Sequence, residues 1–127
     1  MKVLGANGLQ YLITKLMGVD FIVEQGTNGI WKYRKWNSGT AECWAIDSSH
    51  TTGSSTTTNF SISLPAGLFS AKPVVNMTQG TASTVDSRVN YVNVTGTSPN
   101  FAIDCWIYSA LTSKAVTLFI QVIGRWK

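Results

Sequence analysis

The stretch that decides the fold is FAIDCWIYS, residues 101–109, followed after a short connection by AVTLFIQVIG, residues 115–124. Successive side chains of a β-strand point to opposite faces, so a strand covered on one side shows an apolar residue at every second position. The residues that form these two apolar faces are Phe101, Ile103, Cys105 and Ile107, and Val116, Leu118, Ile120 and Val122. We expect two strands that pack against a core and form a hairpin around residues 111–114.

Strand and turn signals of the same kind recur along the chain. Further strands are expected at residues 21–25, 30–36, 40–47, 59–64, 72–79 and 85–95. The connections are too short for the crossover helices that parallel strands need, which predicts antiparallel pairing. The fold is therefore predicted to be all-β, an antiparallel β-sandwich or barrel. Residues 48–58 are rich in Ser, Thr and Gly and are expected to form an exposed loop with a solvated His50.

A different periodicity marks residues 7–17, where the apolar residues are spaced as on one face of a helix. This apolar stripe consists of Leu9, Leu12, Ile13 and Leu16. Asn7 is expected to cap this short N-terminal helix, with Gln10 completing a capping box, and Gly18 to end it. Because so short a helix is marginal alone in water, its stripe must pack on the β domain or on copies of itself around a threefold axis.

The composition favours an oligomer. Charged residues make up only 13% of the chain and hydrophobic residues 44%, so much of the surface must be uncharged or buried against partners. We expect residues 1–20 to be a helical lead-in that holds three copies of the chain together and residues 21–127 to be a β domain. The basic residues are scattered, which predicts no nucleic-acid partner. With no apolar run of bilayer length and no signal-peptide pattern, no membrane insertion is expected.

Residues that could perform chemistry are few. His50, Cys43 and Cys105 lack the spacing of a zinc site, and we predict no metal and no cofactor. The two thiols could pair if their strands were neighbours, although buried free thiols are favoured. Glu24 and Glu42 are two acids that could approach each other across strands, but no nucleophile or metalloprotease motif occurs. We therefore predict that the chain is not an enzyme.

Residues 20–44, DFIVEQGTNGIWKYRKWNSGTAECW, resemble the segment that opens the C-terminal head domain in tail proteins of phages and prophages of Gram-positive gut bacteria. The ending IGRWK, residues 123–127, resembles the C-terminus of the same proteins, and LGANGLQYL, residues 4–12, resembles their helical lead-in. A looser likeness, to the trimeric sugar-binding β-sandwiches called H-type lectin domains, covers residues 60–75 and 120–124.

The resemblance implies a role in host attachment. It implies a homotrimeric receptor-binding head at the tip of a phage tail, made in the bacterial cytoplasm and assembled into the virion with other tail proteins. Such a head would adhere to a host cell-surface saccharide without covalent chemistry. Two alternatives stay open: a purely structural component of the virion, in the tail or baseplate, and a polysaccharide depolymerase.

Aromatic residues supply the candidate contacts. The tryptophans of residues 31–44 could stack on sugars, but structural roles are favoured because large aromatic side chains are mostly buried. The residues assigned to the trimer or to structure are Leu9, Leu12, Ile13, Leu16, Trp31, Trp36 and Trp44. Trp106, Tyr108 and Phe119 are expected to form one outer aromatic patch, used for subunit contact or as a sugar platform. The residues predicted to bind the ligand are Arg88, Asn90, Asp104, Trp106 and Tyr108.

Overall fold

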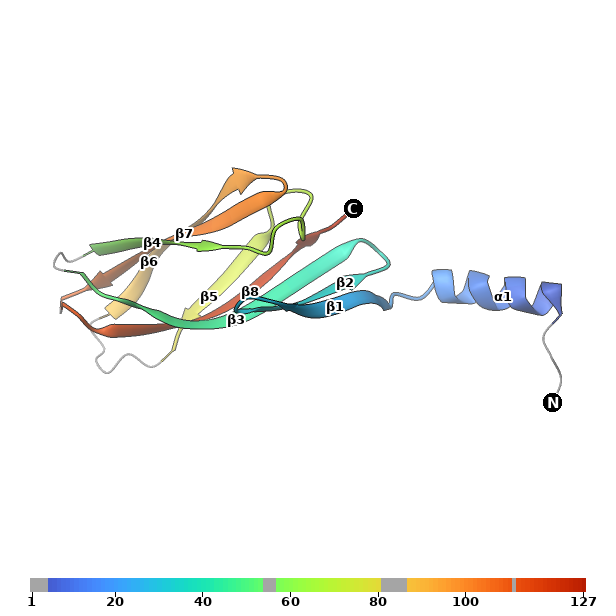
Figure 1. The fold of residues 1–127 in the computed structure, drawn as a ribbon, viewed down its shortest axis with the longest axis horizontal. Helices are drawn as coiled ribbons and strands as arrows, with labels where there is room; N and C mark the ends of the chain where they lie inside the picture. The colour runs from blue at the N-terminus through green and yellow to red at the C-terminus, as the bar shows by residue number, and fades with distance from the viewer. Residues whose placement is uncertain (1–4, 54–56, 81–86, 111) are drawn as a thin grey trace.

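The computed structural model describes residues 5–53, 57–80, 87–110 and 112–127. Its elements are α1 (Ala6–Met17), β1 (Ile22–Asn28), β2 (Trp31–Trp36), β3 (Thr40–Thr51), β4 (Thr57–Ser63), β5 (Val74–Gln79), β6 (Ser87–Thr97), β7 (Asn100–Ser109) and β8 (Ala115–Arg125). The strands form a five-stranded sheet, in the order β1-β2-β3-β8-β5, and a three-stranded sheet, in the order β4-β7-β6. All neighbouring strands are antiparallel, and the sheets face each other as a sandwich (Figure 1), which confirms the predicted fold.

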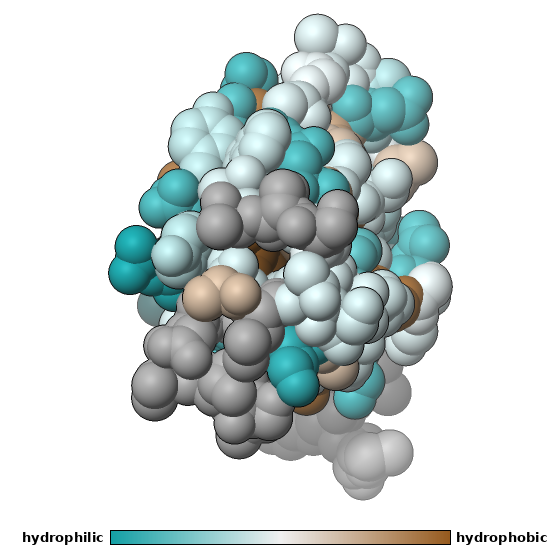
Figure 2. Space-filling model, turned by 90° about the vertical axis from the view of Figure 1, so that its left-hand side faces the viewer, coloured by the Kyte–Doolittle hydropathy of each residue, from teal (hydrophilic) through white to brown (hydrophobic). Residues whose placement is uncertain are grey.

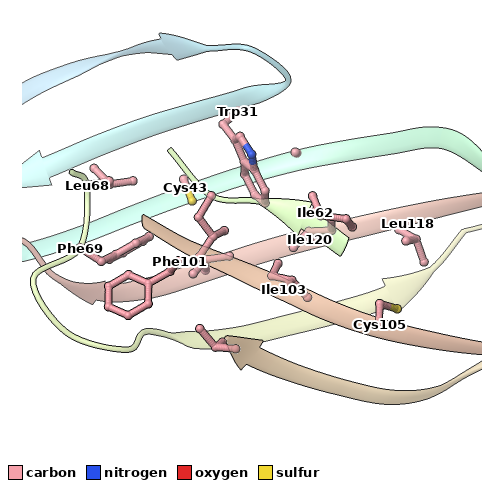
Figure 3. Close-up of a cluster of buried hydrophobic side chains, with 14 of the residues drawn as sticks. Trp31, Cys43, Ile62, Leu68, Phe69, Phe101, Ile103, Cys105, Leu118 and Ile120 are labelled. Atoms are coloured by element: carbon pink, nitrogen blue, oxygen red, sulfur yellow. The ribbon is translucent and has the colours of Figure 1, made fainter. Parts of the chain in front are cut away.

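The core lies between the two sheets. It includes the alternating faces predicted for the last two strands, because Phe101, Ile103, Cys105, Ile107, Val116, Leu118, Ile120 and Val122 are all buried. Trp31 of β2 is only 3% exposed, and its Nε1 donates a hydrogen bond of 2.8 Å to the carbonyl oxygen of Ser63, the last residue of β4. Figure 3 shows this indole beside side chains of the opposite sheet, so Trp31 ties the two layers together.

The predicted hairpin of the last two strands is wrong. β7 and β8 belong to different sheets, so the connection between them crosses from one layer to the other. A strand with one buried face shows the same alternation in either arrangement, so the sequence pattern does not distinguish them. The connection is held to the end of β3 by two backbone hydrogen bonds. Thr52 N donates to Lys114 O over 2.9 Å, and Ser113 N donates to Thr52 O over 2.8 Å.

The loop expected at residues 48–58 is also wrong over much of its length. β3 continues to Thr51 and β4 begins at Thr57, while residues 54–56 lie outside the described part of the chain. The Ser/Thr-rich composition predicted a loop because these residues are favoured in turns. Here they are accommodated at the ends of two strands that pair with β8 and β7.

His50 is half-buried in β3 rather than solvated in a loop. A register shift between Asp47 and His50 places them opposite the buried residues Leu118 and Val116 of β8, so both side chains turn toward the core. The Nε2 atom of His50 lies 2.9 Å from Oδ2 of Asp47, and its ring stacks on Phe60 of β4. The histidine is therefore part of the packing between the two sheets.

The predicted helix is present as α1, which begins one residue earlier than expected, at Ala6. It projects beyond one end of the sandwich rather than lying on a sheet (Figure 1). The exposed fractions of Leu9, Leu12 and Ile13 are 51%, 44% and 41%. The side chain of Leu16 is outside the described side chains. The described residues of the stripe are thus not covered by the β domain of their own chain.

Candidate functional site

Polar and aromatic side chains gather on the outer face of the three-stranded sheet. In the central strand, β7, Asp104, Trp106 and Tyr108 alternate with buried residues and therefore point away from the core. The antiparallel register places partners for each on both neighbouring strands. The resulting rows are Thr57, Tyr108 and Arg88; Asn59, Trp106 and Tyr91; and Ser61, Asp104 and Asn93. Trp106 occupies the centre of this surface and remains 39% exposed.

A β-bulge in β6 shapes the edge of the site. Val89 pairs with the buried Ile107, whereas Tyr91 pairs with Trp106, which is the next residue back along β7. Asn90 is therefore the extra residue of the bulge, and both Asn90 and Tyr91 are exposed. A bulge redirects side chains locally, and this one places an amide and a phenol together beside the indole.

Two hydrogen bonds fix the polar part of the site. Asn59 Nδ2 donates to Oδ1 of Asp104 over 2.6 Å and to the carbonyl oxygen of Cys105 over 3.2 Å. The amide and the carboxylate are thus held beside Trp106 by contacts with β7 itself. A shallow, open hollow of about 340 Å³ lies at this point, lined by Asn90, Tyr91, Asp104 and Trp106.

Arg88 and Tyr108 extend the same face toward the end of the sandwich that is remote from α1. The two residues are paired across β6 and β7, and Cζ of the guanidinium lies 4.7 Å from the centroid of the tyrosine ring. The contact is a cation–π interaction that restrains a long, exposed side chain.

All five predicted ligand residues therefore lie on one continuous surface. We call the set Arg88, Asn90, Tyr91, Asp104, Trp106, Tyr108 and Asn59 the aromatic–polar face. Tyr91 and Asn59 were not predicted. Tyr91 could have been found, because the apolar residues Val89 and Val92 are three positions apart, and both can face inward only if an extra residue lies between them. Asn59 carries no such signal in the sequence.

Phe119 is not part of this surface, so the single aromatic patch predicted for the last two strands is wrong. Phe119 belongs to β8 and points outward from the five-stranded sheet, opposite Ile46 of β3. With Trp44, these side chains line a separate hollow of about 390 Å³. The exposed residues Ile46, Val74, Phe119 and Ile123 form what we call the apolar outer face. The two outer surfaces of the sandwich thus differ in chemistry.

The tryptophans of residues 31–44 are divided among different environments. Trp31 is in the core. Trp36 is half-buried, and its carbonyl oxygen accepts a hydrogen bond of 2.8 Å from Nε1 of Trp126. Trp44 is half-buried on the outer side of the five-stranded sheet, where Cζ of Arg34 lies 4.6 Å from its ring centroid. These three rings do not form a common platform.

The acids considered for catalysis lie apart. The β1–β2–β3 register places Glu24 on the inner side of the five-stranded sheet and Glu42 on its outer side, each beside a cation. Glu24 is 3.2 Å from Lys35, and Glu42 is 3.0 Å from Arg34. The prediction that Glu24 and Glu42 could approach each other across strands is therefore wrong. Asp47 is buried and lies beside the half-buried His50, and Asp86 lies outside the described residues.

Cys43 and Cys105 are free and buried, on strands of the two different sheets. Burial, with a smaller contribution from the charge of Glu42, raises the pKa of Cys43 to about 12. Burial, with a contribution from Asp104, raises the pKa of Cys105 to about 11. Both are therefore thiols rather than thiolates at neutral pH.

Among the described residues, no cluster of three or more His, Cys, Asp or Glu side chains could hold a metal ion. The helix in the described part of the chain is too short to cross a bilayer. Comparison with protein-family models, with curated proteins and with solved structures gave no match to this chain.

Proposed function

We propose that this chain is the receptor-binding head of a phage tail protein and that it attaches to the host by binding a cell-surface saccharide on its aromatic–polar face. The observation that carries the proposal is the partly solvent-exposed indole of Trp106, which is flanked by Tyr91 and by the hydrogen-bonded pair Asn59 and Asp104. The resemblance of residues 20–44 to the opening of phage tail heads supports the assignment to a tail.

The chemistry of this face matches a sugar ring. A pyranose has one face of C–H groups and a rim of hydroxyls, so it is bound by an aromatic ring together with a few convergent polar groups. Trp106 supplies the ring, while the carboxylate of Asp104 and the amides of Asn59 and Asn90 can accept from and donate to hydroxyls. Because Asn59 already holds Asp104 in place, less side-chain freedom is lost on binding.

The arrangement of acids supports adhesion rather than cleavage. Glycoside hydrolysis requires two carboxyl groups that flank the scissile bond. Among the described residues, Asp104 is the one acid of the aromatic–polar face, and Glu24 and Glu42 are engaged with cations on the other sheet. A single carboxylate bonded to Asn59 serves recognition of hydroxyl groups, which requires no acid–base pair.

We further propose that three copies assemble through α1 and the apolar outer face. A twelve-residue helix is marginal alone, and the exposed stripe of Leu9, Leu12 and Ile13 would be covered if identical helices packed side by side. The apolar outer face offers a second surface of the same kind on the sheet that does not carry the sugar site. Three weak sites on one rigid head would bind a repetitive cell wall with avidity.

The surface at the end of the sandwich remote from α1 supports an arrangement in which the helices join the three copies and the other end faces the host. Seen from the end remote from α1, the described residues are mostly hydrophilic or intermediate, with only small apolar spots between them (Figure 2). Such an end would stay in water, toward the host, while the apolar helix stripe lies at the other end of the long axis (Figure 1).

The test is binding to an array of printed bacterial cell-wall polysaccharides. Wild type is expected to bind at least one of them, Trp106→Ala to lose binding by about tenfold or more, and Trp106→Phe to retain most of it. Circular dichroism would verify that both variants are folded. Equal binding by wild type and Trp106→Ala would place the site elsewhere. Failure of the folded wild type to bind any glycan would favour the purely structural virion component. Light scattering across a dilution series would test the trimer.

A further inference from the structure

We infer that the saccharide bound by this face is acidic, with a carboxylate or phosphate group held by Arg88 while a sugar ring lies on Trp106. The inference rests on the proposed function and names the class of ligand that the same site selects.

The position of Arg88 is suited to bind an anion. Its guanidinium lies over the ring of Tyr108, with Cζ 4.7 Å from the ring centroid, and the side chain is exposed. A guanidinium that lies over an aromatic ring can still donate from the N–H groups at its edge to another partner. These donors form the planar fork that binds a carboxylate or a phosphate through two parallel hydrogen bonds. Because the ring restrains the arginine beforehand, its ordering costs less when the ligand arrives.

The charge of Arg88 is not engaged by an acid in the described part of the chain. Glu24, Glu42 and Asp47 are each bound by a cation or by His50 on the five-stranded sheet, and Asp20 accepts hydrogen bonds from Ser38. Asp104 shares the face with Arg88 but is four residues from Tyr108 along β7, on the far side of Trp106, and its Oδ1 accepts from Asn59. Within the described residues the guanidinium therefore has an aromatic partner and no counter-ion.

The two charges give the site a direction. Tyr108, Trp106 and Asp104 are successive outward residues of β7, so the positive end at Arg88 and the negative end at Asp104 are separated by roughly 13 Å along the strand. A short oligosaccharide can span this length with a ring on Trp106. An anionic group would be attracted at the Arg88 end and repelled at the Asp104 end, where hydroxyl groups would be preferred. Attraction and repulsion together would fix which way the chain of sugars lies.

A uronate and a phosphodiester present the same chemistry to an arginine, so the test must separate them. We would print acidic bacterial polysaccharides beside matched neutral forms. One arm pairs uronate polymers with their carboxyl-reduced forms, and the other pairs polysaccharides that carry pendant glycerol phosphate groups with the same polymers after these side groups have been removed. Wild type, Arg88→Gln, Arg88→Lys and Trp106→Ala would be compared, and each would be confirmed as folded by circular dichroism.

Wild type is expected to bind an acidic polymer about tenfold or more tightly than its neutral counterpart, and the arm in which this occurs identifies the anion. Arg88→Gln should lose the preference yet still bind the neutral form, Arg88→Lys should keep part of it, and Trp106→Ala should weaken both. Added salt should weaken wild type and have little effect on Arg88→Gln.

Two results would overturn the inference while leaving the proposed function intact. One is equal binding of acidic and neutral forms by wild type, with both lost in Trp106→Ala. The other is an acidic preference that survives Arg88→Gln. Absence of any binding by the folded wild type would overturn the proposed function and the inference together.

Discussion

The imidazole of His50 lies flat on the ring of Phe60, with the ring centroids 3.9 Å apart and the planes 8° from parallel. His50 is in β3 of the five-stranded sheet and Phe60 is in β4 of the three-stranded sheet, so this stack joins the two layers. The same imidazole is 2.9 Å from Asp47, whose Oδ1 accepts hydrogen bonds from the backbone N and the Oγ of Ser49. One histidine therefore connects a packed ring and a buried carboxylate.

Replacement of His50 by Ala should lower the free energy of unfolding by about 1–3 kcal/mol, because it removes the stack and leaves a buried carboxylate with fewer partners. His50→Phe should retain the stack and lose only the polar contact, giving a smaller loss. Urea denaturation followed by circular dichroism would measure both. The matched control is Ser48→Ala at an exposed neighbouring position, expected within about 0.5 kcal/mol of wild type. A His50→Ala midpoint equal to that of the control would show that the stack does not stabilise the fold.

Asp47 should make the stability of the domain depend on pH. Burial by itself would raise the pKa of Asp47, but the hydrogen bonds from Ser49 and the nearby His50 outweigh it and hold the pKa below its ordinary value. The unfolded chain then binds the proton more tightly than the folded chain does, so acidification favours unfolding. This contribution should be complete above the pKa of an unfolded aspartate, about 4, and should disappear as the pH falls through the lower folded-state pKa.

The measurement is urea denaturation of wild type and Asp47→Asn at a series of pH values from neutral to acid. Wild type should lose more stability than the variant over the acid range, because the variant lacks this titration. Parallel curves for the two proteins would show that Asp47 titrates equally in the folded and unfolded states. Ser49→Ala, which removes one of the two hydrogen bonds from Ser49, should give an intermediate curve.

The thiols should be unreactive in the folded protein. Alkylation requires the thiolate, and burial with neighbouring negative charge raises the pKa of Cys43 to about 12 and that of Cys105 to about 11. Iodoacetamide at mildly alkaline pH should therefore leave both unmodified by mass spectrometry, whereas the denatured chain should take up two groups. Ser48→Cys, at an exposed position, provides the matched control and should be modified in the folded state. Rapid modification of native wild type would mean that the sandwich opens readily.

Some features of this fold depend only on residues that are close in the sequence, and these features can be predicted from the local pattern of residues. The buried side of β8, from Val116 to Val122, follows from alternation alone. Whether β7 and β8 pair depends on which sheet each one joins, and alternation is the same in both cases. The position of His50 also depends on how the sheets are arranged. Its Ser-rich surroundings indicate a loop, whereas its contact with Phe60 exists only once the two sheets are stacked.

The candidate site shows the same division. Trp106, Asp104 and Tyr108 lie on one side of a single strand, so their common face could be predicted from their spacing. Arg88 joins them through the pairing of β6 with β7, which the sequence suggested without proving. Tyr91 was missed because strict alternation places it on the same side of β6 as Val89, facing the core, and the bulge at Asn90 turns it outward.

The bulge at Asn90 makes a prediction that separates folding from binding. Deleting Asn90 would leave Val89, Tyr91 and Val92 in regular alternation, with both valines inward and the tyrosine outward, so β6 could still pair with β7 along its length. The deletion should therefore change the free energy of unfolding by no more than about 1 kcal/mol. The saccharide site, however, would lose the amide of Asn90 and the extra local twist that the bulge gives to β6, and affinity for a bound glycan should fall by about tenfold or more. Asn90→Ala, which keeps the bulge and removes only the amide, should lose less affinity.

Denaturation and glycan binding measured on both variants would show whether the bulge serves binding or folding. Wild-type affinity in a folded deletion variant would exclude the bulge from the site. A deletion variant that unfolds would show that the extra residue serves the fold.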